Sequence, residues 1–217
     1  MILYRPTDGD VYTTPIRWRP KTAFLMAQLG GAVPPVVGEI RQRVESVLGE
    51  NGYELVDADS VTTGKDFLLK IWQLVLSTPV GIAIVHEGIS SSTMSNIFYE
   101  LGWMQAYGKE TIVVKAGNAA IPSDFVRTEY VPFDGNFDRR LRSFMKELTD
   151  RAEYYAIVAE QVERNPLLAI DYFRRAFLLT DDESLRERAR EIYSASGLKD
   201  RAKNSVETLL TSFAENR

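Results

Sequence analysis

The chain of 217 residues contains no cysteine and a single histidine, His86. Without cysteine it can form no disulfide, use no thiol chemistry and build no thiolate-bound metal site. A histidine-based metal centre needs more than one imidazole, so we expect no bound metal. Any catalysis must therefore depend mainly on carboxylates.

Long apolar runs and an excess of positive charge are also missing. No stretch approaches the roughly 20 residues of a membrane-spanning helix, and the first residues lack the apolar core of a signal peptide. We therefore expect a cytoplasmic protein with no membrane segment. The formal net charge of −4 argues against direct nucleic-acid binding and favours a small-molecule or protein partner.

Apolar runs alternate with segments of helical spacing between residues 21 and 136. The predicted strands are residues 23–27, 53–56, 80–85, 111–114 and 130–133, and the predicted helices are residues 36–48, 66–76 and 93–107. This alternation predicts a doubly wound α/β domain, flavodoxin-like or Rossmann-like, with a parallel sheet of about five strands. Residues 1–20, with three prolines, are predicted to form an extended leader.

The pattern of apolar and polar residues changes at residue 137, and no apolar run after it is typical of a strand. Segment 137–217 is therefore predicted to be an all-α tail, with helices over residues 138–163, 167–179, 183–194 and 199–214. Residues 154–180 have the pattern of one tetratricopeptide-type hairpin, and one such repeat normally needs neighbours to share a core. We expect the tail to bind a second copy or a partner protein, and the alternative is a simple helical cap.

Glu100 is the main candidate for catalysis. It lies on a predicted helix that begins just past the end of strand 80–85, where ligands bind in open α/β sheets. Asn96 and Trp103 share its face of the helix, and we expect them to bind substrate, although a tryptophan on a packed helix is more often core. Gly102 weakens a helix by about 1 kcal/mol relative to alanine, so we expect a strand or a ligand to approach the backbone there.

Further binding candidates follow the ends of the predicted strands. Ser90, Ser91 and Ser92 open the Glu100 helix, where hydroxyls and free N–H groups attract anions, unless they form only a plain cap. By position, Gln28 and Gly30 could contact a sugar or phosphate, and the alternative is turn formation. His86, the only group with an ordinary pKa near neutral, could assist departure of a base, and the alternative is a structural role. Asp57 completes the set, with the alternative of a loop solvator or cap.

Several short segments resemble the nucleoside 2-deoxyribosyltransferase-like superfamily and its TIR-like relatives. The most specific is Asn-Ile-Phe-Tyr-Glu-Leu-Gly at residues 96–102. The other similar segments are residues 21–27, 80–85, 106–109, 111–114, 121–125 and 130–134. The resemblance covers residues 21–134 and leaves the tail outside.

The resemblance implies that Glu100 cleaves the bond between a base and a sugar, by attacking the anomeric carbon or by stabilising the oxocarbenium ion. The substrate would be a nucleoside, a deoxynucleotide or NAD, with no separate cofactor. Transferases of this group pass the deoxyribosyl unit to another base, whereas TIR-like members hydrolyse NAD or related nucleotides. Many relatives act in anti-phage defence, and many form oligomers.

Two positions depart from the pattern of that superfamily. Phe24 stands where the transferases often carry a tyrosine that orients the catalytic carboxylate, and residues 77–79 read Ser-Thr-Pro where many members have an aspartate. Two hypotheses therefore stay open. One is an N-glycosidase or deoxyribosyltransferase, and the other is a non-catalytic nucleotide-sensing module or interaction scaffold with the same fold.

Overall fold

The computed structural model describes residues 3–12, 16–58, 67–122, 125 and 130–196. The chain divides into two compact units, one formed by residues 22–146 and the other by residues 1–21 together with 147–217. Helix α4 (Phe137–Gln161) contributes residues to both units. The predicted helix over residues 199–214 lies outside the described residues.

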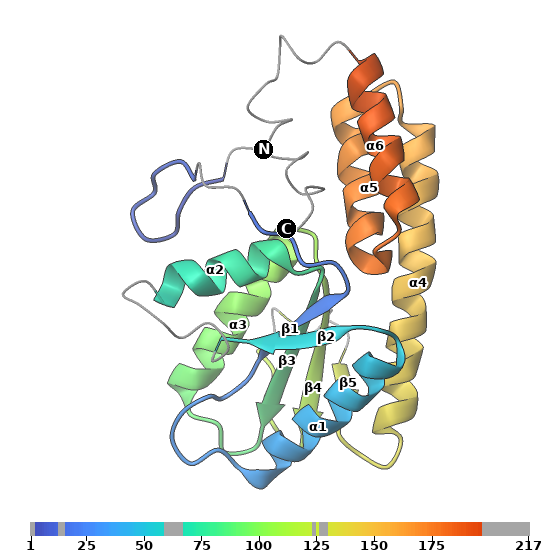
Figure 1. Cartoon of the computed structure of the whole chain (residues 1–217). Coiled ribbons are helices and arrows are strands. Elements are labelled where there is room, and N and C mark those ends of the chain that lie inside the picture. The colour runs from blue at the N-terminus through green and yellow to red at the C-terminus, as the bar shows by residue number, and fades with distance from the viewer. Residues whose placement is uncertain (1–2, 13–15, 59–66, 123–124, 126–129, 197–217) are drawn as a thin grey trace. The chain divides into compact units, whose positions relative to one another are not determined.

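Residues 22–146 form a doubly wound α/β unit, which confirms the predicted fold class (Figure 1). The strands are β1 (Thr22–Met26), β2 (Glu54–Asp57), β3 (Val80–His86), β4 (Glu110–Ala116) and β5 (Tyr130–Pro132). All neighbouring pairs are parallel, in the order β2-β1-β3-β4-β5. This is the flavodoxin-like strand order, whose topological switch point lies between β1 and β3.

Strand β3 is the centre of the sheet, and all seven of its residues are buried. A continuous apolar run is expected of a parallel strand that is covered on both faces. Gly81 within it allows a close approach, because a Cβ there would lie 3.0 Å from the terminal methyl carbons of both Met26 and Met104. The residue types in β3 therefore match a strand enclosed on both sides.

Helices cover the two faces of the sheet. Helices α2 (Phe67–Ser77) and α3 (Ser91–Ala106) pack side by side on one face, where Ile71, Val75, Ile97 and Leu101 meet alternate residues of β1, β3 and β4 (Figure 1). Right-handed crossovers put α1 (Pro35–Glu50) on the opposite face. Val37, Ile40, Val44, Val47 and Leu48 form its buried stripe.

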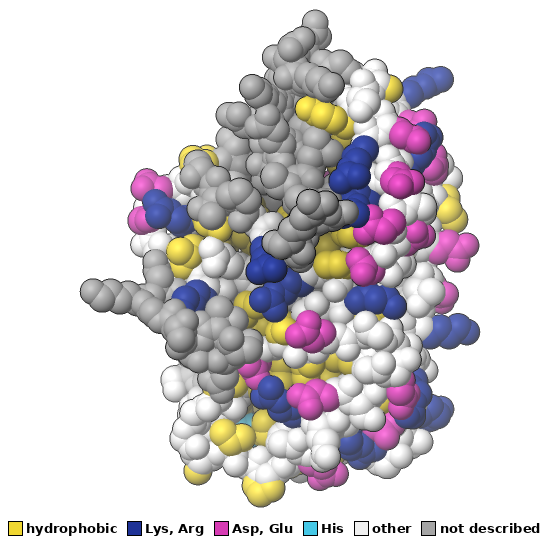
Figure 2. Space-filling model, viewed as in Figure 1, with side chains coloured by type: hydrophobic (Ala, Val, Ile, Leu, Met, Phe, Trp, Pro, Cys, Tyr) yellow, Lys and Arg dark blue, Asp and Glu magenta, His cyan; other side chains and the backbone are white. Residues whose placement is uncertain are grey.

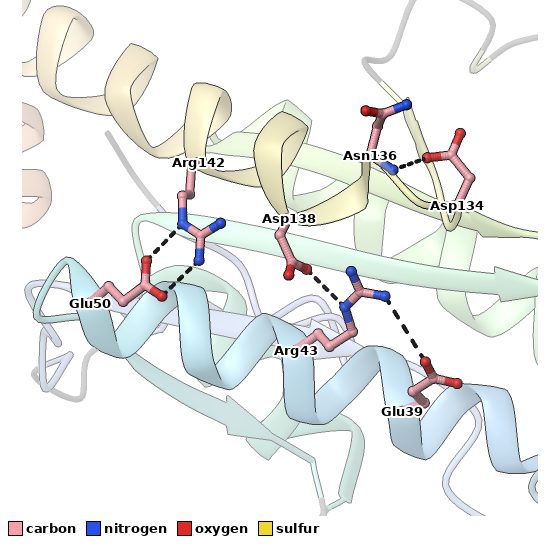
Figure 3. A network of polar contacts seen from close by, with 7 residues as sticks. All are labelled: Glu39, Arg43, Glu50, Asp134, Asn136, Asp138 and Arg142. Carbon is pink, nitrogen blue, oxygen red and sulfur yellow. Dashed lines mark hydrogen bonds and ion pairs between the residues drawn. The ribbon is translucent and has the colours of Figure 1, made fainter.

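Ion pairs join α1 to the first turns of α4 (Figure 3). Arg43 Nε lies 2.8 Å from Asp138 Oδ1, and its guanidinium stacks over the rings of Phe133 and Phe137 at 5.2 and 5.3 Å. One turn further along α4, Arg142 holds both carboxylate oxygens of Glu50 at 2.8 and 2.9 Å. The start of α4 is thereby fixed against the α/β unit by both charge and aromatic packing.

The second unit is helical. It contains the later part of α4, α5 (Pro166–Thr180) and α6 (Glu183–Ala195), with Asn165 and Asp182 as side-chain N-caps of α5 and α6. Residues 16–21 pack onto α5, since Trp18 lies 4.5 Å from the Arg174 guanidinium and the Lys21 N–H donates to Leu178 O. Figure 2 shows acidic and basic side chains interspersed over these helices. Within the described residues, no helix is long and apolar enough to cross a membrane.

We expect replacement of Arg43 by alanine to lower the free energy of unfolding by about 1–2 kcal/mol, because it removes the ion pairs with Asp138 and Glu39 together with two ring contacts. Arg142→Ala is the matched control. It removes an exposed ion pair with no ring contact, so its cost should be distinctly smaller. Chemical denaturation of both variants measures the difference, and equal costs would contradict the role given to the rings.

Candidate active site

The loop after β3 leads directly into α3. Gly88 adopts a left-handed conformation (φ +81°) that turns the chain, and Ser90 Oγ accepts the backbone N–H of Thr93 at 3.1 Å. Ser90 is therefore the N-cap of α3, and its hydroxyl also contacts those of Ser92 and Thr93. Ser91 and Ser92 lie exposed in the first turn, where unpaired backbone N–H groups favour an anion.

Glu100 lies in the middle of α3, on a flank that faces α2. Tyr107, seven residues further along and hence on the same face, accepts a hydrogen bond from Trp72 Nε1 of α2 at 3.2 Å. Asn96, one turn before Glu100, is exposed, and Trp103, one turn after it, is partly buried against the core. The predicted grouping of Asn96, Glu100 and Trp103 is thus present in the structure.

Burial raises the pKa of Glu100 from the ordinary 4.5 to about 7. Among the described residues, no hydrogen-bond or ion-pair partner of its carboxylate is found. A buried polar group without a partner needs an explanation, and a carboxyl group whose pKa is shifted in this way is characteristic of catalytic sites. Glu100 is therefore half-buried, and its pKa lies near neutral pH.

Tyr99 is an aromatic residue next to Glu100 that the sequence interpretation missed. Its side chain is 54% exposed, and its ring lies 4.3 Å from that of Trp103. The spacing of four residues between two aromatic side chains on one helix could have indicated this contact.

Gln28, His86 and Gly30 meet at the switch point between β1 and β3. His86 Nε2 lies 2.9 Å from Gln28 Oε1, and Gln28 Nε2 donates to the Gly30 carbonyl oxygen at 3.0 Å. His86 Nδ1 lies 2.9 Å from the Glu87 carbonyl oxygen. A neutral imidazole carries one N–H and can satisfy one of these two oxygens, whereas a ring with hydrogen on both nitrogens satisfies both. Neither nitrogen is open to a substrate in this arrangement.

Asp57 ends β2, and its side chain is almost fully buried. Its Oδ2 lies 2.5 Å from Nη2 of Arg41, which belongs to α1. A buried carboxylate is stabilised by such a cationic partner. The structure therefore gives Asp57 a contact within the fold, on a strand that is separated from β3 by β1.

The close approach expected at Gly102 is absent among the described residues. A Cβ on this glycine would meet no heavy atom within 4 Å. The expectation that a strand approaches this glycine was therefore wrong, whereas the approach of a ligand stays a prediction. In the described part of the chain, no group of three His, Asp or Glu side chains is placed to hold a metal ion.

No protein-family profile matches this chain, and no curated protein matches it. Among solved structures it is similar to the CMP N-glycosidase BcmB of Clostridium botulinum, at 21% sequence identity and a TM-score of 0.38. The match covers 57% of this chain and 96% of that one. A likeness at this level does not establish a shared activity.

The raised pKa of Glu100 makes stability depend on pH. The folded state binds an extra proton between about pH 4.5 and 7, so ionisation of this group costs stability as the pH rises through that window, by up to about 3 kcal/mol. Glu100→Gln should therefore match the natural chain near pH 4.5 and exceed its stability at pH 8. Denaturant unfolding of both proteins from pH 4.5 to 8.5 checks this, and a constant difference would show that Glu100 is not shifted.

Gly102→Ala should stabilise the protein by roughly 0.5–1 kcal/mol, because alanine favours a helix over glycine and has space here. Thermal and denaturant unfolding measure the gain. A loss of stability would mean that something fills the space beside this glycine.

Proposed function

We propose that the α/β unit of this chain is a nucleotide or nucleoside N-glycosidase, or a deoxyribosyltransferase, that uses Glu100. The single observation that supports this most directly is a half-buried carboxyl group with no described partner, on the helix that leaves the central strand of a 2-1-3-4-5 parallel sheet. Carboxylates in glycoside chemistry act next to the positive charge that develops at the anomeric carbon.

In the proposed reaction the ionised carboxylate of Glu100 faces the anomeric carbon of the sugar. The bond from that carbon to the base nitrogen breaks, and its electron pair leaves with the base. Glu100 either forms a bond to the anomeric carbon or stabilises the oxocarbenium ion. In hydrolysis, water adds to the anomeric carbon and its released proton goes to the departed base. In transfer, a second base adds through its ring nitrogen and loses the proton on that nitrogen, which the first base takes up.

The other site residues take supporting roles in this proposal. Asn96, exposed one turn from Glu100, would bind the sugar, and the exposed Ser91 and Ser92 would offer hydroxyl and N–H groups to a phosphate. Trp103, with Tyr99, provides an aromatic surface for a base. Ser90 supports the site as the N-cap of α3.

A non-catalytic nucleotide sensor is the second candidate, and two observations favour it. Phe24 is fully buried in the core and has no hydroxyl to orient Glu100. The hydroxyls of Ser77 and Thr78 both donate to the Leu74 carbonyl oxygen, at 3.2 and 2.8 Å, and so serve the end of α2. A sensor would be stabilised by nucleotides without consuming them.

We extend the proposal to the helical unit and to biological context. Residues 137–217 are proposed to bind a second copy or a partner protein, which is supported by exposed Tyr154, Ile157 and Leu168 on α4 and α5. By resemblance, the whole chain would act as an effector in anti-phage defence.

The test of catalysis is incubation with NAD, NADP, deoxynucleosides and deoxynucleotides, followed by chromatography for free base. Glu100→Gln should lower turnover by at least about 10³-fold, as loss of a catalytic group does. Glu54→Gln is the control, because Glu54 is exposed at the amino end of β2. Nucleotide-dependent thermal stabilisation without any base release would select the sensor instead.

The pH profile reports the form of Glu100 that reacts. Because the carboxylate is the reactive form, kcat/KM should rise with pH and level off above about 7. A profile that falls through the same pH would contradict this, since it would make the protonated Glu100 a general acid.

A further inference from the structure

Gln28 and His86 form a hydrogen-bonded pair between the ends of two neighbouring strands. His86 closes β3 and is only 3% exposed, and its Nε2 lies 2.9 Å from Gln28 Oε1. The other end of the same amide donates to the Gly30 carbonyl oxygen at 3.0 Å. A continuous path of hydrogen bonds therefore runs from the central strand into the loop after β1.

The loop after β1, residues 28–34, contains a turn at Gly31. Gly31 adopts a left-handed conformation (φ +74°), and the Val33 N–H donates to its carbonyl oxygen at 3.1 Å. A Cβ on Gly31 would lie 3.8 Å from Gln28 Nε2, so the Gln28 amide rests against the turn itself. This loop leaves the sheet at the switch point between β1 and β3, where doubly wound sheets bind ligands.

We propose that Gln28 and His86 are positioning residues that hold the loop of residues 28–34 in the shape that receives the substrate. Their polar side-chain atoms are taken up by each other, by Gly30 and by the Glu87 carbonyl. The loop therefore meets the ligand through its backbone and its glycines. The part of this inference that concerns substrate rests on the proposed function, and the part that concerns the loop does not.

The two hydrogen bonds of the Gln28 amide can be removed separately by substitution. Gln28 must accept a hydrogen bond from His86 and donate one to Gly30. Gln28→Glu keeps an acceptor for His86 and loses the donor to Gly30, whereas Gln28→Met loses both at nearly the same size. Gln105→Met is the matched control, because the Gln105 amide donates to Thr111 near the amino end of β4, away from the loop after β1.

Two measurements on the full chain test the loop directly. Exchange of the backbone N–H groups of residues 28–33 should be about five- to tenfold faster in both Gln28 variants, as expected for one lost hydrogen bond, and unchanged in Gln105→Met. Since His86 is the only histidine, the NMR signal of its Nε2–H is unambiguous. That signal should persist in Gln28→Glu and disappear by exchange with water in Gln28→Met.

Unchanged loop exchange in Gln28→Glu would overturn the inference, even if Gln28→Met fails to fold. If a substrate is found, Gln28→Glu should raise KM about five- to tenfold and change kcat by less than about threefold, because Glu100 on α3 is untouched. An unchanged KM would overturn the substrate part alone. If the natural chain turns over nothing, the proposed function fails, while exchange and NMR still decide whether the pair holds the loop.

Discussion

The pairing of β3 with β1 on one side and β4 on the other is the constraint on which the site depends. Its register places Met26 opposite Ala83 and His86 opposite Ala116. Gln28, two residues past Met26, therefore comes level with the end of β3 and meets His86. A slip of one residue would put a side chain in the place of Gly81, where a Cβ would lie 3.0 Å from both Met26 and Met104, so the packing that fixes the core also fixes this register.

The position of Glu100 follows from how α3 packs on this sheet. Ile97, Leu101 and Met104 face the core, which leaves Glu100 at the margin of the buried stripe rather than in water or in the centre. At that margin the carboxyl group loses enough hydration to raise its pKa to about 7. Ionisation of Glu100 lowers the stability of the fold, and the burial of apolar side chains in the core compensates for that loss.

The fold and the main face of α3 could be predicted from sequence, because both follow from local periodicity. The spacing of Asn96, Glu100 and Trp103 is a property of one helix. Contacts between distant residues could not be predicted in this way. Gln28 and His86 are 58 residues apart, and Arg43 and Asp138 are 95 apart, so their meeting depends on strand order and helix packing. The expectation that a strand approaches Gly102 failed for a related reason. Helix propensity gives the free energy that a glycine costs a helix, but it does not say which contact in the folded protein compensates for that cost.

Asp57 and Glu100 are two carboxyl groups that the fold places in different electrostatic environments. Both carboxyl groups are withdrawn from water, one at the end of β2 and one on the helix after β3. Asp57 has the guanidinium of Arg41 at 2.5 Å, so its charge is balanced within the fold. Glu100 has no such cation among the described residues, and burial raises its pKa instead. In the proposed reaction, the positive charge that develops at the anomeric carbon would balance the Glu100 carboxylate. The environment of each carboxylate, rather than its residue type, thus separates a carboxylate that is paired within the fold from one whose pKa is raised.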